Sequence, residues 1–164
     1  MNTKIEGRTI WLLGIVTLSM MFDQIIKLIV TIYASKMPIV IIKNVLKLNY
    51  CQNRGGAFSI GEGNVQLIIV LNIIIIGALI IFYKKNKESL TKLAITFLGM
   101  VIAGGVSNLE DRILNGYVID FIDINEVFDF AVFNIADIFI VVGICGLGIL
   151  FLFNKLTINN YNRI

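Results

Sequence analysis

The sequence predicts an α-helical integral membrane protein, in which four transmembrane helices carry a small extracytoplasmic β-rich platform between the first and second helices. Of 164 residues, 57% are hydrophobic and 15% are charged, and the mean hydropathy of +0.87 is too high for an ordinary soluble domain. A single proline and apolar runs near membrane-spanning length favour helices over a barrel. We expect one membrane domain, residues 1–164, with helices at about residues 9–34, 64–83, 92–110 and 135–153.

The first helix contains two charged residues in an otherwise apolar run. Asp23 and Lys27 are four positions apart, so they share one helical face, and the acid precedes the base, which is the favourable order for an ion pair. The pair is either an anchor at the membrane interface or a support for a functional site, and both interpretations stay open. No small-residue cleavage site follows this helix, so we expect it to be retained rather than removed as a signal peptide.

Residues 36–63 form the expected extracytoplasmic platform. Pro38 ends the first helix, and the β-branched residues that follow, with partial alternation, predict short strands. A polar stretch then contains four glycines, at positions 55, 56, 61 and 63. They allow close approach to a ligand, or they simply turn the chain back to the membrane, and by themselves they favour the turn.

The second and third helices are joined by a short basic loop. Residues 63–83 contain no charge and are long enough to cross the hydrocarbon region. The third apolar run has small residues at helical spacing, which predict close packing against another helix: Gly99, Ala103, Gly104 and Ser107.

A second extracytoplasmic segment, residues 111–133, holds most of the acid and precedes the fourth helix. Eight lysine and arginine residues lie on the side that holds both termini, and six lie on the opposite side, which also holds most of the acidic residues. We therefore place both termini in the cytoplasm and the acidic segment outside.

Charge and cysteine usage restrict the partners. The net charge of +3 comes from scattered basic residues, so we expect membrane lipids and no nucleic acid as partners. Cys51 lies in a polar stretch and Cys145 in an apolar helix, so both are interpreted as structural thiols that do not pair.

The absence of histidine excludes a Ser-His-Asp triad, a Cys-His pair and histidine-ligated zinc. Neither Ser59 nor Ser107 has a neighbouring lysine, which argues against a Ser-Lys pair. Asp111 is expected to be held ionised by Arg112 or by another cation. The remaining loop acids are interpreted as solvated: Asp123, Glu126 and Asp129.

Two carboxylates remain, Asp120 and Asp137, each among apolar residues and each at the end of a segment. Ionisation is costly in such surroundings, so their proton affinity should be raised. Two close carboxylates share a proton, and such a dyad activates water with one member while the other donates to a carbonyl. Neutral donors and acceptors that could orient the dyad are Asn53, Asn108 and Asn134. This chemistry needs neither a metal nor a cofactor.

Five motifs in order resemble those of the bacterial lipoprotein signal peptidases, or signal peptidase II: DQIIK at 23–27, NRGGAF at 53–58, GGVSNLEDR at 104–112, GYVIDF at 116–121 and FNIAD at 133–137. The resemblance covers nearly the whole chain. It implies an aspartic endopeptidase of the bacterial cytoplasmic membrane, with its active site at the extracytoplasmic face, and we expect the protein to be a monomer. The implied reaction removes the signal peptide from a diacylglyceryl-modified prolipoprotein, on the N-terminal side of the lipidated cysteine.

The resemblance also implies roles for individual residues. Asp120 and Asp137 correspond to the catalytic pair. Residues that support the site and the substrate are Asn53, Gly55, Asn108, Arg112 and Asn134. Structural support comes from Asp23, Lys27 and Asp111. The chain departs from the usual family pattern at Gly56, Ser107 and Ile138, which bears on rate and fine specificity.

Two other classes of protein compete with the peptidase. A small four-helix proton-coupled transporter would also use membrane carboxylates, but such carriers usually place the key acid near the membrane centre. A non-catalytic membrane scaffold would leave Asp120 and Asp137 as ordinary interface residues.

The expected topology is testable by cysteine labelling in intact cells. A cysteine introduced in the loop 84–92 should be protected from an impermeant reagent, and one introduced at residues 36–55 should react, because the first lies in the cytoplasm and the second outside. Labelling of the 84–92 loop from outside would overturn this orientation.

Overall fold

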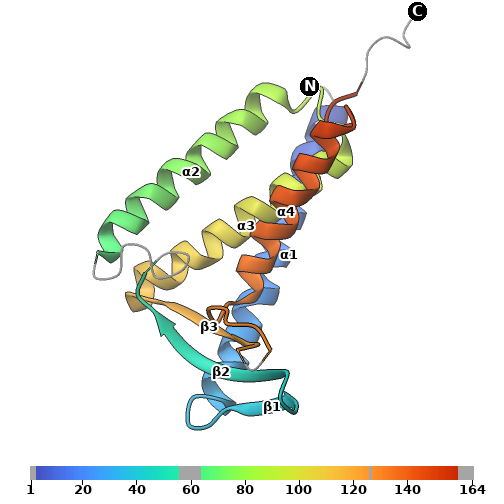
Figure 1. Ribbon diagram of the computed structural model, residues 1–164. Coiled ribbons are helices and arrows are strands. Elements are labelled where there is room, and N and C mark those ends of the chain that lie inside the picture. Colours follow the sequence, from blue (N-terminus) through green and yellow to red (C-terminus); the bar gives the residue numbers. More distant parts are fainter. Residues whose placement is uncertain (1–2, 56–63, 126, 159–164) are drawn as a thin grey trace, which may run out of the picture.

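The computed structural model describes residues 3–55, 64–125 and 127–158 (Figure 1). Within these ranges the chain forms four helices: α1 (Thr3–Tyr33), α2 (Val65–Asn86), α3 (Lys92–Asn115) and α4 (Ile135–Leu152). Three strands complete the fold: β1 (Ile39–Ile42), β2 (Leu46–Asn53) and β3 (Val118–Asp123). All four helices are long and apolar enough to cross a membrane, so the predicted fold class is confirmed.

Local capping explains where α3 begins and ends. The Thr91 side chain accepts a hydrogen bond from the Ala94 N–H, which caps the first turn. Gly116 ends the helix in the left-handed conformation, φ 79°, and its N–H bonds to the Arg112 carbonyl. α3 continues to Asn115, past the expected end at residue 110, so Asp111 and Arg112 lie on its last turns.

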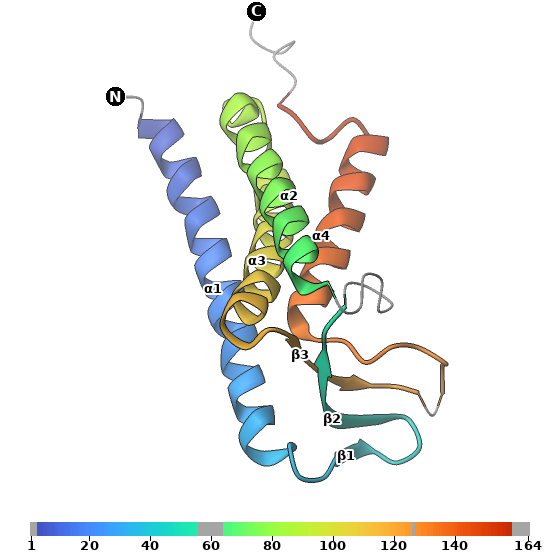
Figure 2. The ribbon, with the colours of Figure 1, turned by 90° about the vertical axis from the view of Figure 1, so that its left-hand side faces the viewer.

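α3 is the central helix, and it packs against the three others (Figure 2). A Cβ at Gly99 would lie 2.9 Å from Ile15 Cγ2 of α1, and a Cβ at Gly104 would collide with the backbone carbonyl of Ala136 in α4. Ala103 and Ser107 lie on the same helix with no exposed surface. The predicted close packing of small residues is thus present, and it brings the first turn of α4 against the backbone of α3.

α2 lies on the outside of the bundle. Ile76 and Tyr83 are its buried residues, and most of its large apolar side chains are exposed. In water such a surface would be unstable, whereas in a bilayer it faces lipid at no cost.

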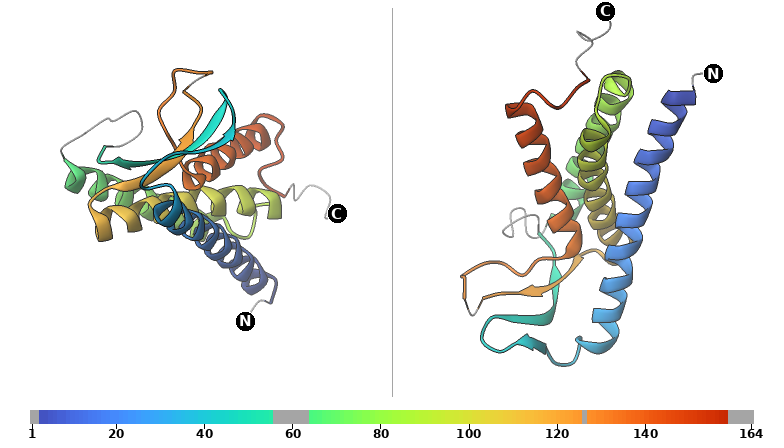
Figure 3. Two further views of the ribbon diagram at one scale, coloured as in Figure 1. Left: turned by 90° about the horizontal axis from the view of Figure 1, so that it is seen from below. Right: turned by 90° about the vertical axis from the view of Figure 1, so that its right-hand side faces the viewer.

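The three strands form one antiparallel sheet in the order β1-β2-β3. β1 and β2 come from the predicted platform between the first two helices, but β3 comes from the segment between α3 and α4, where the sequence analysis predicted no strand. Its sequence, VIDFID, is interrupted by two acids and therefore resembles a loop. The sheet lies at the end of the bundle opposite both termini (Figure 3).

The interpretation of Asp123 as a solvated loop acid is wrong. Its side chain is buried at the end of β3, where it accepts from Asn49 Nδ2 at 2.9 Å and from the Asn125 N–H at 3.0 Å. Lys47 Nζ lies 3.6 Å from Asp123 Oδ2. Burial acts to raise the pKa of Asp123, but these donors and the lysine outweigh it, and the pKa is lowered. Local donors thus replace water around this carboxylate.

Asp129 is exposed, as expected for a solvated acid. Other residues singled out in the sequence lie outside the described ranges: Gly56, Ser59, Gly61, Gly63 and Glu126.

Two apolar clusters flank the region where the sheet meets the helices. One lies between the helices and includes Ile95, Leu98 and Ile102 of α3. The other lies beneath the sheet, where Phe121 of β3 packs with Val30 of α1. Between these clusters the chain buries an unusual number of polar side chains, which form the candidate site.

Candidate active site

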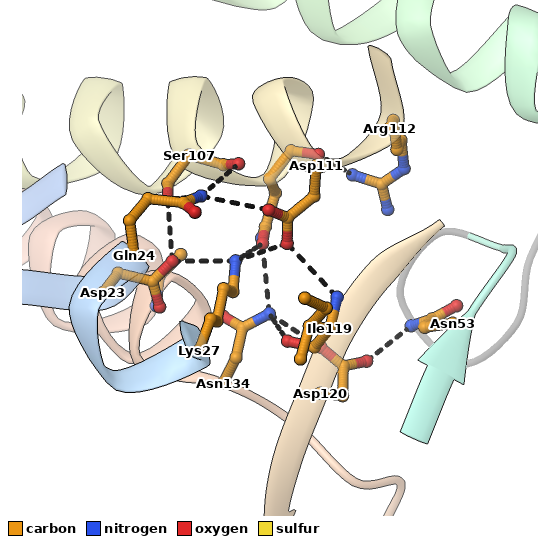
Figure 4. A network of polar contacts seen from close by, with 12 residues as sticks. Asp23, Gln24, Lys27, Asn53, Ser107, Asp111, Arg112, Ile119, Asp120 and Asn134 are labelled. Atoms are coloured by element: carbon orange, nitrogen blue, oxygen red, sulfur yellow. Dashed lines mark hydrogen bonds and ion pairs between the residues drawn. The ribbon is translucent and has the colours of Figure 1, made fainter. Parts of the chain in front are cut away.

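Asp120 projects from the middle of β3 and is almost fully buried, with 2% of its surface exposed. Its Oδ2 accepts from Asn53 Nδ2 of β2 at 2.9 Å, and its Oδ1 accepts from Asn134 Nδ2 at 2.7 Å (Figure 4). Two neutral amides therefore hold both oxygens of this carboxyl group without adding charge.

Asp137 lies in the first turn of α4. Asn134 is the N-cap, and the two residues form a reciprocal capping box: the Asp137 N–H donates to Asn134 Oδ1, and the Asn134 N–H donates to Asp137 Oδ2 at 3.1 Å. Asp137 Oδ1 accepts from Asn108 Nδ2 of α3 at 2.8 Å. The helix N-terminus adds a partial positive charge beside this buried carboxyl group.

Asn134 connects the two aspartates. Its Nδ2 donates to Asp120 Oδ1 and, at 3.0 Å, to Asn108 Oδ1, while its Oδ1 and N–H bind Asp137. It has no exposed surface. Both aspartates and all three asparagines named from the sequence therefore meet in one network.

Arg112 and Gly55 are also brought to this network. Arg112 Nη2 donates to the Gly55 carbonyl at 2.9 Å, and Nη1 donates to the Asn108 carbonyl at 3.1 Å. The Gly55 N–H in turn donates to Asn53 Oδ1. Arg112 Nε has no hydrogen-bond partner among the described residues. The guanidinium thus adds positive charge beside the paired carboxyls and braces the end of β2.

The cation that faces Asp111 is Lys27, not Arg112. Lys27 Nζ lies 2.8 Å from Asp111 Oδ2 and 2.7 Å from Asp23 Oδ2, and it donates to Asn108 Oδ1 at 3.2 Å. All three charged side chains are at least 97% buried. The predicted Asp23–Lys27 pair is present, and its burial excludes the alternative of an interfacial anchor.

Burial is the main cause that raises the pKa of Asp120, and the charge of Asp137 raises it further. The hydrogen bonds from Asn53 and Asn134 and the charge of Lys27 oppose this effect, and the pKa of Asp120 lies at about 7. Asp120 therefore exchanges a proton near neutral pH, which suits a general acid or base.

Two residues of the network were missed by the sequence analysis. Gln24 Nε2 donates to Ser107 Oγ and to Asp111 Oδ1, each at 3.0 Å, and Ser107 Oγ donates to Asp23 Oδ2 at 2.7 Å. Ser107 was named for close packing and as a departure from the family pattern, but no hydrogen bond was predicted for it. Gln24 could have been found from the sequence, because it is a polar residue next to Asp23 inside an otherwise apolar helix.

Both cysteines are free thiols, as predicted. Cys51 lies on β2 opposite Asp120 in the sheet register. Burial is the largest cause that raises the pKa of the Cys51 thiol, with the charges of Asp120 and Asp123 adding to it.

The helices and the site define a polytopic membrane protein in which two carboxyls, joined through Asn134, lie at one end of a four-helix bundle. A family model described as signal peptidase (SPase) II matches residues 15–153. The chain belongs to the signal peptidase II family.

Known relatives agree with this assignment. The chain is 38% identical to a lipoprotein signal peptidase of Caldicellulosiruptor bescii over 84% of this chain and 88% of that protein. It is 39% identical to one of Halothermothrix orenii over 86% of this chain and 94% of that protein. Two solved structures of bacterial membrane enzymes are similar in fold, with TM-scores of 0.77 and 0.73 at 28% and 30% identity. They cover 93% and 86% of this chain, and each is itself covered over 92% of its length. The protein is thus a bacterial multi-pass membrane protein.

The hydrogen bond from Asn53 should hold the pKa of Asp120 down. Because Asn53 donates to the ionised carboxylate, Asn53→Ala should raise the pKa of Asp120 above about 7. Titration of the aspartate carboxyl ¹³C signals by NMR measures this. Asn49→Ala, which removes a donor from Asp123 instead, is the matched control and should leave Asp120 unchanged. An unchanged or lowered Asp120 pKa in Asn53→Ala would contradict this account.

Proposed function

We propose that this protein is a membrane aspartic endopeptidase that removes the signal peptide from diacylglyceryl-modified prolipoproteins. Cleavage falls on the N-terminal side of the lipidated cysteine. The observation that carries the proposal is the pair Asp120 and Asp137, joined through Asn134, in a chain of the signal peptidase II family. Relatives described as lipoprotein signal peptidases support the substrate class.

The two carboxyls divide the acid and base roles. Asp137 accepts backbone and amide hydrogen bonds at a helix N-terminus, and these donors and the partial positive charge of the helix offset part of the cost of a buried negative charge. Asp120, with a pKa of about 7, holds its proton below about pH 7. Asp137 then takes a proton from water, which attacks the scissile carbonyl, while Asp120 donates its proton to the carbonyl oxygen.

The surrounding polar groups keep this pair oriented and limit its charge. Asn53, Asn108 and Asn134 donate to the carboxyls, so the dyad can share one proton without a further charged partner. Arg112 and the Gly55 carbonyl lie at the edge of the network and contribute to binding of the peptide backbone. No metal or other cofactor takes part in the proposed steps.

The position of the site suits a substrate that arrives through the bilayer. Asp120 belongs to the sheet and Asp137 to the first turn of a membrane helix, so both lie at the edge of the bundle, away from the termini. We place the termini in the cytoplasm and the site at the extracytoplasmic face of the cytoplasmic membrane. There a monomer can receive both the signal helix and the acyl chains from the lipid phase.

No observation favours the transporter. Inside the bundle, Lys27 is paired with Asp23 and Asp111, and all three side chains are buried, so neither of these two carboxylates is left free to bind a transported cation.

Substitution of either aspartate should abolish cleavage. Asp120→Asn and Asp137→Asn keep the size of the side chain but remove the group that gives or takes a proton, so turnover should fall by about 10³-fold or more. Cleavage of a purified, lipidated prolipoprotein in detergent or nanodiscs measures turnover, and thermal unfolding in the same medium checks the fold. Asp129→Asn, which changes an exposed acid, should remain within about twofold of wild type. Near-normal turnover in either dyad variant would remove the two-aspartate mechanism.

The substrate class and the independence from metal are tested together. Lipidated substrate should be cleaved at least about 10²-fold faster than its unlipidated counterpart, because the acyl chains position the scissile bond at the membrane edge. EDTA should not change the rate, since the proposed water activation uses carboxyls alone. Equal cleavage of both substrates would refute the substrate class, and loss of activity in EDTA would refute the mechanism.

A further inference from the structure

Lys27 lies between two carboxylates that come from different helices. Its Nζ is 2.7 Å from Asp23 Oδ2, on its own helix α1, and 2.8 Å from Asp111 Oδ2, on α3. The three side chains are excluded from solvent, so the charges cannot separate without leaving one of them unpaired in the protein interior. We call these three residues the Lys27 clamp.

Asp23, one of the two carboxylates of the clamp, binds the backbone of the residue that precedes Asp137. We call this connection the Asp23 arm. Asp23 Oδ1 accepts the backbone N–H of Ala136 at 2.8 Å. Ala136 lies in the first turn of α4, where an N–H has no partner within its own helix. This bond therefore fixes the start of α4 relative to α1.

Asp111, the other carboxylate, binds the backbone of the residue that precedes Asp120, and we call this connection the Asp111 arm. Asp111 Oδ2 accepts the backbone N–H of Ile119 in β3 at 3.2 Å. Each arm thus ends on the main chain immediately before one member of the dyad, and Lys27 joins the two arms.

Gln24 and Ser107 brace the clamp from the opposite side. Gln24 Nε2 donates both to Asp111 Oδ1 and to Ser107 Oγ. Because the Ser107 oxygen accepts this bond, its own hydroxyl proton is free to be donated to a different acceptor. Ser107 Oγ donates that proton to Asp23 Oδ2 at 2.7 Å. The two carboxylates are therefore linked twice, once through Lys27 and once through Gln24 and Ser107.

We propose that the Lys27 clamp fixes the separation of Asp120 and Asp137, and that Gln24 and Ser107 are positioning residues for this dyad. The inference rests on the proposed function. Proton sharing between two carboxyls depends steeply on their distance and orientation. A displacement of about 1 Å in a catalytic group costs on the order of 10²-fold in rate. Backbone bonds at the positions just before the two aspartates control that distance more directly than side-chain contacts alone.

The test uses two variants and one control of the full-length protein. Ser107→Ala removes the bracing hydroxyl without adding bulk. The second variant, Asp23→Asn with Lys27→Met and Asp111→Asn, removes all three charges and leaves none unpaired. Thr9→Val is the control, because Thr9 also donates within α1 and contacts Tyr83 through its hydroxyl, but it lies at the other end of the bundle.

Two readouts are measured: exchange of the Ile119 and Ala136 amide protons by NMR, and kcat and KM with a lipidated prolipoprotein. Ser107→Ala should speed exchange of the Ala136 amide about tenfold and lower kcat about tenfold, with KM within about twofold. The neutral triple variant should speed exchange at both amides and lower kcat about 10²-fold. Thr9→Val should leave exchange at both amides and kcat within about twofold of wild type.

Each result decides the proposal. Unchanged exchange at Ala136 and unchanged kcat in folded Ser107→Ala would overturn it, as would an equal loss of kcat in Thr9→Val. A wild-type protein that does not cleave the substrate would count against the proposed function instead. In that case the exchange rates still decide whether the clamp holds the two backbone positions.

Discussion

The site depends on the buried ion pairs that the Lys27 ammonium forms with Asp23 and Asp111. Burying charges in this way yields little net stability, but leaving a partner unpaired costs about 3–5 kcal/mol. The network therefore admits one arrangement of the elements it joins and penalises others. Through Asp23 it holds α4 and through Asp111 it holds β3, so a single cation in α1 determines how two distant segments meet.

The side chains that donate hydrogen bonds directly to the dyad are neutral amides, in contrast to the clamp. Asn53, Asn108 and Asn134 supply hydrogen bonds at 2.7–2.9 Å to the two carboxyls. Full charges at these positions would fix the ionisation of each aspartate and prevent it from changing during a reaction. Charge therefore sets the position of the backbone, while amides orient the reactive groups and leave their protonation free to alternate.

The site lies where the sheet meets one end of the helix bundle. The sheet closes one end of the bundle, and Phe121 of β3 packs on Val30 of α1, so the site is shielded from water on the protein side. The long apolar surface of α2 faces away from the bundle, toward lipid. The pKa of Asp120 reflects mainly its burial.

The sequence by itself determined the membrane class, the four helices and the two candidate aspartates, because long apolar runs and isolated acids are properties of local composition. The Asp23–Lys27 pair also followed from local spacing, since i and i+4 share a helical face. Only the tertiary structure decided that Lys27 faces Asp111, that 118–123 is a strand and that Asp123 is buried. These features depend on partners far away in the chain: β3 forms a strand because it pairs with β2, and Asp111 is paired with Lys27 of α1. A local sequence pattern does not encode contacts between segments that only folding brings together.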